Sequence, residues 1–161
     1  MIQGIMIRAA CFLICAVASA SCAAPLPERP TLCQLAGAQE DYVGRELTVE
    51  GYLFLSGHGN DIVEPTCRGA GVAVSWDWNR PQLQPFFSFL RGIDYFEPWV
   101  IRVRATGVMM RGEGRGDYAI RFHLRLNTAD VLDAWKVPEA QVERFSMWSQ
   151  GFGPAPVRPR R

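Results

Sequence analysis

Residues 45–55 read RELTVEGYLFL, and this alternating stretch decides the fold class. Leu47, Val49 and Gly51 share one face, and polar side chains occupy the positions between them. A period of two residues is typical of a strand that is buried on one side only. A glycine inside such a strand indicates a bulge or a bend. We therefore expect a long, half-buried strand with a bulge or a bend at Gly51.

A second long alternation covers residues 99–110 and its partner covers 117–126, with the glycine-rich loop 111–116 between them. Apolar residues in these two segments alternate with a basic outer set, namely Arg102, Arg104, Arg121, His123 and Arg125. This arrangement predicts an antiparallel hairpin with one buried face.

Shorter elements complete the pattern. Residues 61–64 and 71–78 predict two short strands, and the proline-broken stretch 79–98 predicts a helical or irregular insert rich in aromatic residues. Thr31 is a candidate N-cap for a short helix over 32–38, and 129–135 is expected to close as a helical turn.

This order predicts a mainly β fold: a small five-stranded OB-like barrel with a short N-terminal helix and an insert before the fourth strand. A β-sandwich is the alternative. We expect a signal peptide over 1–21, a proline-rich tether over 22–30, the barrel over 31–136 and a C-terminal extension over 137–161. The end of that extension, rich in Pro, Gly and Arg, is expected to be disordered.

The N-terminus has the pattern of an export signal. Arg8 precedes an apolar run over 9–18, which is too short to span a bilayer, and small residues follow. Cleavage after the Ala-x-Ala motif at 18–20 gives a product that begins at Ser21. Alternatively, residues 19–22 (SASC) resemble the lipobox of bacterial lipoproteins, in which Cys22 becomes the lipid-bearing first residue.

The cysteine count bears on this choice. The chain has five cysteines, of which Cys11 and Cys15 leave with the signal. An odd remainder in an exported protein favours lipidation of Cys22. Cys33 and Cys67 are then left as a pair, for which a disulfide is the default in an oxidising compartment and two free thiols are the alternative.

Four short motifs carry a resemblance: TLCQL at 31–35, YVGR at 42–45, LTVEG at 47–51 and PTC at 65–67. They resemble a family of small exported or lipoprotein bacterial domains with a V-C-x-L helix, a Y-x-G-K/R turn, a V-x-V-x-G strand and a second cysteine. The resemblance implies an OB-like barrel stapled by Cys33–Cys67. It implies no activity, since that family is largely uncharacterised.

Composition and motifs exclude several classes of function. The 161 residues carry a net charge of +1, and loss of Arg8 lowers it to zero, so a nucleic-acid-coating protein is not expected. The chain contains no G-x-S-x-G, no P-loop and no H-E-x-x-H motif. No catalytic residue, metal or cofactor is therefore assigned. The one enzyme alternative is a small exported hydrolase that uses His58, Asp61 and Glu64.

A possible ligand face combines the basic outer set with Trp76 and Trp78, although structural pairing and packing are the favoured interpretation of these residues. The basic outer set could bind an anion, but Glu46 and Glu50 are expected opposite Arg102 and Arg104 as cross-strand pairs. Trp76 and Trp78 share one strand face, and they either stack on a sugar or peptide or lie under the insert. We expect a non-catalytic binding or structural module of the bacterial envelope, lipid-anchored or periplasmic. Its partners would be the membrane and an envelope protein, saccharide or peptide.

Overall fold

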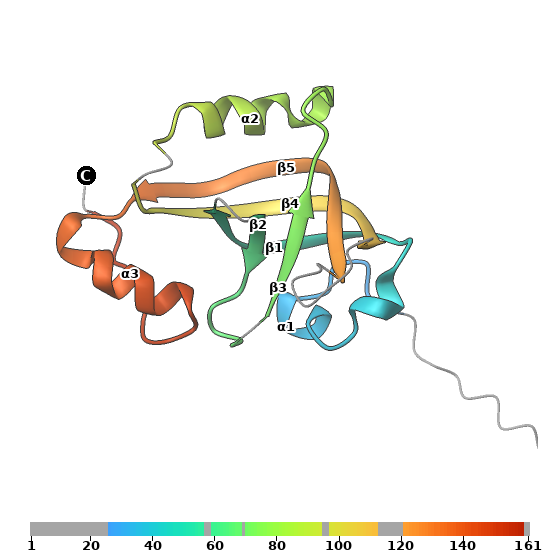
Figure 1. Cartoon of the computed structure of the whole chain (residues 1–161), viewed down its shortest axis with the longest axis horizontal. Helices are drawn as coiled ribbons and strands as arrows, with labels where there is room; N and C mark the ends of the chain where they lie inside the picture. The colour runs from blue at the N-terminus through green and yellow to red at the C-terminus, as the bar shows by residue number, and fades with distance from the viewer. Residues whose placement is uncertain (1–25, 57–58, 69, 95–96, 113–120, 160–161) are drawn as a thin grey trace, which may run out of the picture.

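A computed structural model describes residues 26–56, 59–68, 70–94, 97–112 and 121–159. Its five strands form a closed barrel in the order β1–β2–β3–β5–β4, with β3 and β5 parallel and all other neighbours antiparallel (Figure 1). The strands are β1 (Glu46–Ser56), β2 (Gly59–Val63), β3 (Gly71–Ser75), β4 (Trp99–Arg111) and β5 (Phe122–Lys136). The predicted OB-like barrel is confirmed.

Strand β1 follows the predicted alternation, with Leu47, Val49 and Leu53 buried. Of the two alternatives predicted at Gly51, a bulge is wrong, because pairing with β4 runs without a shift from Glu46 to Tyr52. Close packing gives a reason for a glycine at this position. A Cβ at this position would lie 2.5 Å from Leu32 Cδ1 and 2.8 Å from the Val63 carbonyl oxygen. Gly51 therefore lets the N-terminal helix approach the barrel wall.

Strand β5 is longer than expected and replaces the helical turn predicted over 129–135. Its register against β4 shifts twice, between Arg102 and Val103 and between Thr106 and Gly107. Each shift leaves one β5 residue, Leu132 and Asn127 respectively, without a partner on β4. Such bulges bend a strand and re-aim its side chains. The bulges interrupt the simple alternation that a half-buried strand would show.

Helix α1 (Leu32–Leu35) is shorter than the predicted 32–38, and a 3-10 turn follows at Gln39–Tyr42. Thr31 is its N-cap, as predicted, and forms a reciprocal capping box with Gln34. Cys33 in this helix is bonded to Cys67 in the loop after β2, with 5.7 Å between the Cα atoms. The predicted disulfide is confirmed.

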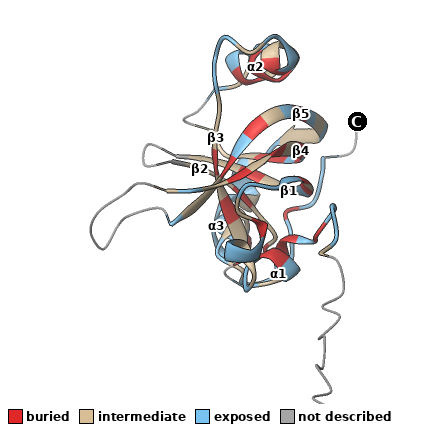
Figure 2. Ribbon diagram, turned by 90° about the vertical axis from the view of Figure 1, so that its right-hand side faces the viewer, coloured by how far each residue is buried: buried red, intermediate tan, exposed pale blue. Residues whose placement is uncertain are grey.

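Two further helices lie on opposite sides of the barrel (Figures 1 and 2). Helix α2 (Gln84–Arg91) belongs to the insert and buries Phe86, Phe87 and Leu90. Helix α3 (Val142–Ser149) lies within the predicted C-terminal extension, on the same side as α1. Within the described residues, no helix is long and apolar enough to cross a membrane.

Candidate functional site

The outer face of β4 carries an ion-pair cluster. Glu50 lies opposite Arg104 in the β1–β4 register. Arg104 Nε donates to Glu50 Oε1 at 2.8 Å, and Arg102 Nη2 donates to Oε2 at 3.2 Å. The hydrogen bond from Arg104, together with the charges of both guanidinium groups, holds the pKa of Glu50 below its ordinary value. The predicted cross-strand pairing is confirmed for Glu50.

The same prediction is wrong for Glu46. That residue lies opposite Val108, and its Oε1 accepts from Asn127 Nδ2 at 2.6 Å. Asn127 Oδ1 in turn accepts from Arg80 Nη1 at 2.5 Å. The result is a polar chain from the insert across β5 to β1. Nothing in the sequence indicates this row of hydrogen bonds, because it depends on the bulge that leaves Asn127 without a strand partner on β4.

The remaining basic residues of the predicted ligand face lie apart from this cluster. Arg125 is exposed and lies opposite Val108, while half-buried His123 lies opposite Met110. Arg121 is exposed just before β5. Since Arg104 lies opposite Asp130, further along β5, the two groups of basic residues occupy different stretches of the hairpin.

The two tryptophans of the predicted face differ in exposure. Trp76 is half-buried, with its ring edge-on to Phe86 and Phe87 at 5.9 and 6.1 Å. Trp78 packs on Phe87 at 4.4 Å but stays 55% exposed. Phe86 and Phe87 of the insert are buried in the main core, so the insert packs against the barrel, and Trp78 marks its outer edge.

The loop residues of the hydrolase alternative do not form a described cluster. His58 and the lipidation candidate Cys22 lie outside the described residues. Glu64 Oε1 accepts from both the backbone and the hydroxyl of Thr66. Asp61 is the cross-strand partner of Phe54, and burial raises its pKa. In the described part of the chain, no three His, Cys, Asp or Glu side chains converge as metal ligands.

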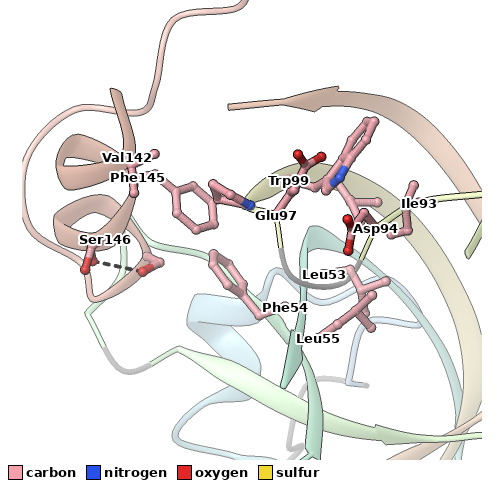
Figure 3. Close-up of a pocket in the computed structure, with 13 residues that line it drawn as sticks. Leu53, Phe54, Leu55, Ile93, Asp94, Glu97, Trp99, Val142, Phe145 and Ser146 are labelled. Atoms are coloured by element: carbon pink, nitrogen blue, oxygen red, sulfur yellow. Dashed lines mark hydrogen bonds between the residues drawn. The ribbon is translucent and has the colours of Figure 1, made fainter. Parts of the chain in front are cut away.

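A cleft lies between the barrel and α3 (Figure 3). It has a volume of about 380 Å³ and combines the end of β1, the segment leading into β4, and one face of α3. The residues that line it are Leu53, Phe54, Leu55, Ile93, Asp94, Glu97, Pro98, Trp99, Ile101, Val142, Phe145, Ser146 and Ser149. Its size lies within the range of small-ligand pockets.

The walls of the cleft are apolar and its ionisable groups are acidic. The rings of Phe54 and Phe145 stack at 5.8 Å, which joins β1 to α3. Asp94 and Glu97 lie toward the opposite wall, near Trp99 (Figure 3). Glu97 Oε1 accepts from Lys136 Nζ at 2.5 Å. The indole N–H of Trp99 is buried without a hydrogen-bond partner. An apolar cleft with a few polar groups at fixed positions can bind and orient a small ligand.

The cleft was not predictable from the sequence, because its walls come from three distant segments. One signal was present: Val142, Phe145 and Trp148 recur at intervals of three residues, which is the spacing of one helix face. That spacing predicts an amphipathic helix, and such a helix needs an apolar surface to cover.

A second hollow of about 420 Å³ lies beside the disulfide, lined in part by Arg29, Thr31, Cys33, Glu64 and the Glu50–Arg104 pair. Both signs of charge are present in its lining, and Glu50 and Glu64 already have donors. This hollow therefore offers no clear charge preference to a ligand.

No protein-family model and no curated protein matches the chain. Solved structures that it resembles include an OBody, AM2EP06, bound to hen egg-white lysozyme, at 18% identity and a TM-score of 0.41, with 61% of this chain and 89% of that chain covered. Another is asparaginyl-tRNA synthetase from Pyrococcus horikoshii complexed with asparaginyl-adenylate, at 14% identity and a TM-score of 0.43, with 69% and 26% covered. The fold assignment rests on the strand order of the barrel itself.

Proposed function

We propose that this protein is an exported, non-catalytic binding module of the bacterial envelope, anchored through a lipid on Cys22, which holds a small ligand in the cleft between β1 and α3. It would belong to the family of small exported OB-like domains that its N-terminal motifs resemble. The cleft is the observation that carries the binding function.

The disulfide supports the location. Cys33 and Cys67 form a bond with ordinary Cα separation, and such bonds persist in oxidising, non-cytoplasmic compartments. With these two cysteines paired, and Cys11 and Cys15 inside the signal, Cys22 is the one cysteine left over. Lipidation would account for it, and residues 22–30 would then tether the barrel to the membrane surface.

The electrostatics favour the cleft over the ion-pair cluster on β4 as the binding site. Glu50 already contacts Arg102 and Arg104, so an anionic ligand would have to compete with a carboxylate that is held in place at 2.8 Å. The cleft needs no such exchange, because its walls are apolar and three chain segments shape it.

The anchor is tested by intact-mass analysis of the full chain expressed in a bacterial host, with Cys22→Ser as the variant and Cys11→Ser as the matched control inside the signal. We expect diacylated, membrane-bound protein from the wild type and from Cys11→Ser, and unlipidated protein from Cys22→Ser. A wild-type product that begins at Ser21 without lipid would contradict the anchor.

Binding at the cleft is tested on the exported Cys22→Ser protein by amide NMR with a panel of small amphiphiles. We expect at least one probe to shift resonances of the cleft walls, at Phe54, Phe145 and Trp99, and to leave those around Arg125 unchanged. If no probe of any charge type shifts the wall resonances, the cleft is not a binding site.

A further inference from the structure

The chain reverses direction after helix α3 and runs back along that helix. Gly151 and Gly153 both lie in the left-handed region of the backbone, with φ values of 83° and 75°, which glycine adopts without strain. Beyond this turn, residues 154–158 (PAPVR) contact α3, the 3-10 turn that precedes α3, and strand β5. These five residues are called the tail segment below.

We propose that the surface under the tail segment is a peptide-binding site and that the tail segment is its tethered ligand. The external ligand is an extended segment of another protein that carries proline, any residue and arginine in that order. The side chains that hold the tail segment include Gln141, Asp133 and Trp135, and none of these three lines the cleft between β1 and α3. The inference is therefore independent of the small-ligand function proposed for that cleft.

The backbone of the tail segment is held by a side-chain amide. The Val157 N–H donates to Gln141 Oε1 at 2.6 Å, and Gln141 Nε2 donates to the Val157 carbonyl at 3.2 Å. Arg144 Nε also donates to the Pro154 carbonyl at 3.4 Å. Hydrogen bonds to the main chain supply affinity for an extended peptide whatever its side chains are. This part of the site is therefore not specific to the sequence of the tail segment.

The side chains of the tail segment provide the selectivity, because they alternate between contact and exposure. Pro156 is buried, Val157 is 58% exposed, and the guanidinium of Arg158 contacts β5. Peptide-binding domains select a sequence by placing alternate side chains of an extended peptide in pockets. Proline suits such a position, since its fixed φ leaves less conformational freedom to lose on binding. Positions 156 and 158 are therefore selective, and position 157 is not.

The arginine of the tail segment has two partners on β5. Arg158 Nη1 lies 3.0 Å from Asp133 Oδ1 and 3.1 Å from Oδ2, and its guanidinium carbon lies 5.9 Å from the ring centroid of Trp135. A carboxylate beside an aromatic ring favours arginine over a neutral side chain. The side chains of Arg158 and Asp133 stay 47% and 33% exposed, so this ion pair contributes modestly and exchanges readily.

The way the tail segment is held allows an external peptide to replace it. Among the described residues, neither apolar core cluster includes a member of the tail segment. A segment held outside the core opens at a lower cost than the elements that build the core. The external peptide competes with a tethered segment whose effective concentration is on the order of millimolar. Binding should therefore be weak while the tail segment is intact and stronger once it is released.

The experiment uses the exported, full-length Cys22→Ser protein with and without Pro156→Ser/Arg158→Ser, which removes the two selective side chains and releases the tail segment. The probe is the peptide acetyl-GPAPVRP-amide, which has the sequence of residues 153–159. Its binding is followed by NMR of the Gln141 side-chain amide. We expect the released chain to bind the probe at least about tenfold more tightly than the chain with its intact tail segment. A thermal melt checks that the released chain is folded.

Changes in the probe and in Gln141 test which contacts carry the binding. Replacement of the probe's valine by threonine should leave its affinity unchanged, whereas replacement of the second of its three prolines by alanine should weaken it. Gln141→Ala in the released chain should weaken binding about tenfold, because two hydrogen bonds to the peptide backbone are lost. The matched control is Gln150→Ala, since Gln150 donates to Ser146 Oγ within α3 and should not affect the probe.

The arginine position is tested by a double-mutant cycle. Asp133→Asn in the released chain should weaken binding of the probe about threefold, as expected for an exposed ion pair. The same substitution should have no effect on a probe in which glutamine replaces arginine. Asp130→Asn is the control, because Asp130 is also an exposed aspartate on β5 but does not contact the tail arginine.

Three results would overturn the proposal. They are equal affinity of the probe for the released and the intact chain, equal affinity for a probe of scrambled sequence, and a dimer of the intact chain that forms by exchange of tail segments. A measurement on the intact chain needs no substitution in the tail. Hydrogen exchange at the Val157 amide, which is bonded to Gln141, should speed up when excess probe is added. An unchanged exchange rate at saturating probe would show that the peptide does not take the place of the tail segment.

Discussion

Helices α1 and α3 lie on the same side of the barrel, yet they are attached to it in different ways. The four residues of α1 bury Leu32 and Leu35 in the main core, carry a capping box and are joined to the barrel by a disulfide. The eight residues of α3 bury only Trp148, have no side-chain N-cap, and leave Met147 about half exposed. The shorter helix is the more firmly held.

This difference shows that covalent linkage and buried area, rather than helix length, decide how an element is held. It also bears on function. The α1 side of the barrel is fixed, whereas α3 rests on a small separate cluster of Val100, Val137 and Trp148. Since α3 forms one wall of the cleft and buries fewer residues than α1, we expect that wall to open at a lower cost than the barrel wall.

The largest effect is expected from removal of the disulfide that joins α1 to the barrel. The double variant Cys33→Ala/Cys67→Ala frees a loop of sequence separation 34, and on the chain-entropy model it should lower the free energy of unfolding by about 3–4 kcal/mol. Urea denaturation measures the loss. A loss smaller than that of the Trp148 variant described next would reverse the comparison between the two helices.

Trp148→Ala should lower the free energy of unfolding by about 2 kcal/mol, which is less than the ~3–5 kcal/mol typical of a tryptophan in a core. The loss is smaller because α3 can undock, so that no cavity is left. Hydrogen exchange should show lost protection in α3 and at Val137, with protection of β4 and β5 retained. Uniform loss of protection throughout the barrel would mean that α3 is part of the main cooperative unit.

Gly51→Ala tests how closely α1 is packed. The added methyl would lie 2.5 Å from Leu32 Cδ1 and 2.8 Å from a backbone oxygen, and overpacking of this kind costs about 1–2 kcal/mol. Gly37→Ala is the control, since a Cβ there meets nothing within 4 Å. Equal melting temperatures for the two variants would show that α1 shifts freely to make room.

The smallest effects come from two carboxylates, one near each helix, and they have opposite signs. Glu50 lines the hollow beside α1, and its pKa is lowered by Arg104 and Arg102. Its contribution to stability is therefore present above a pH of about 4 and is lost as the pH falls through the lowered value. At pH 7, Glu50→Gln should lower the free energy of unfolding by less than about 1 kcal/mol, since the ion pair is exposed. In strong acid it should change nothing, because Glu50 is then protonated.

Asp61 is the strand partner of Phe54, which stacks on Phe145 of α3, and its pKa is raised by burial. Here the stabilising form is the protonated one, so the contribution is full below the ordinary aspartate value and is lost as the pH rises through the raised value. Asp61→Asn should therefore raise the melting temperature at pH 7 and leave it unchanged at pH 3. A decrease at pH 7 would show that the charged form makes a favourable contact.

The elements that the sequence predicts well are those governed by local rules. Alternation identified β1 and β4, the Thr31 cap identified the start of α1, and cysteine accounting together with a family resemblance identified the disulfide. The missed features depend on distant partners. Bulges at Asn127 and Leu132 arise from pairing with β4, so residues 129–135 looked helical when they form strand.

The site was harder to predict than the fold for the same reason. Asp94 and Glu97 look like ordinary loop residues in the sequence. They become part of a cleft wall only because α3 docks on Phe54. Pairing between Glu50 and the arginines was predictable because both strands alternate regularly. The Glu46 pairing failed because the antiparallel register that places Glu50 opposite Arg104 places Glu46 opposite Val108, and its carboxylate accepts from Asn127 instead.

The position of the disulfide along the chain has a consequence for the order of folding. Cys33 and Cys67 both precede β4 and β5, and a chain that enters an oxidising compartment from its N-terminus presents them before the strands that close the barrel. The cross-link between α1 and the end of β2 can therefore form while the β4-facing edge of β1 is still unpaired. Until residues 102–108 arrive, that edge can pair with another chain. Early oxidation would leave this edge exposed for just as long, because the disulfide does not supply the missing strand.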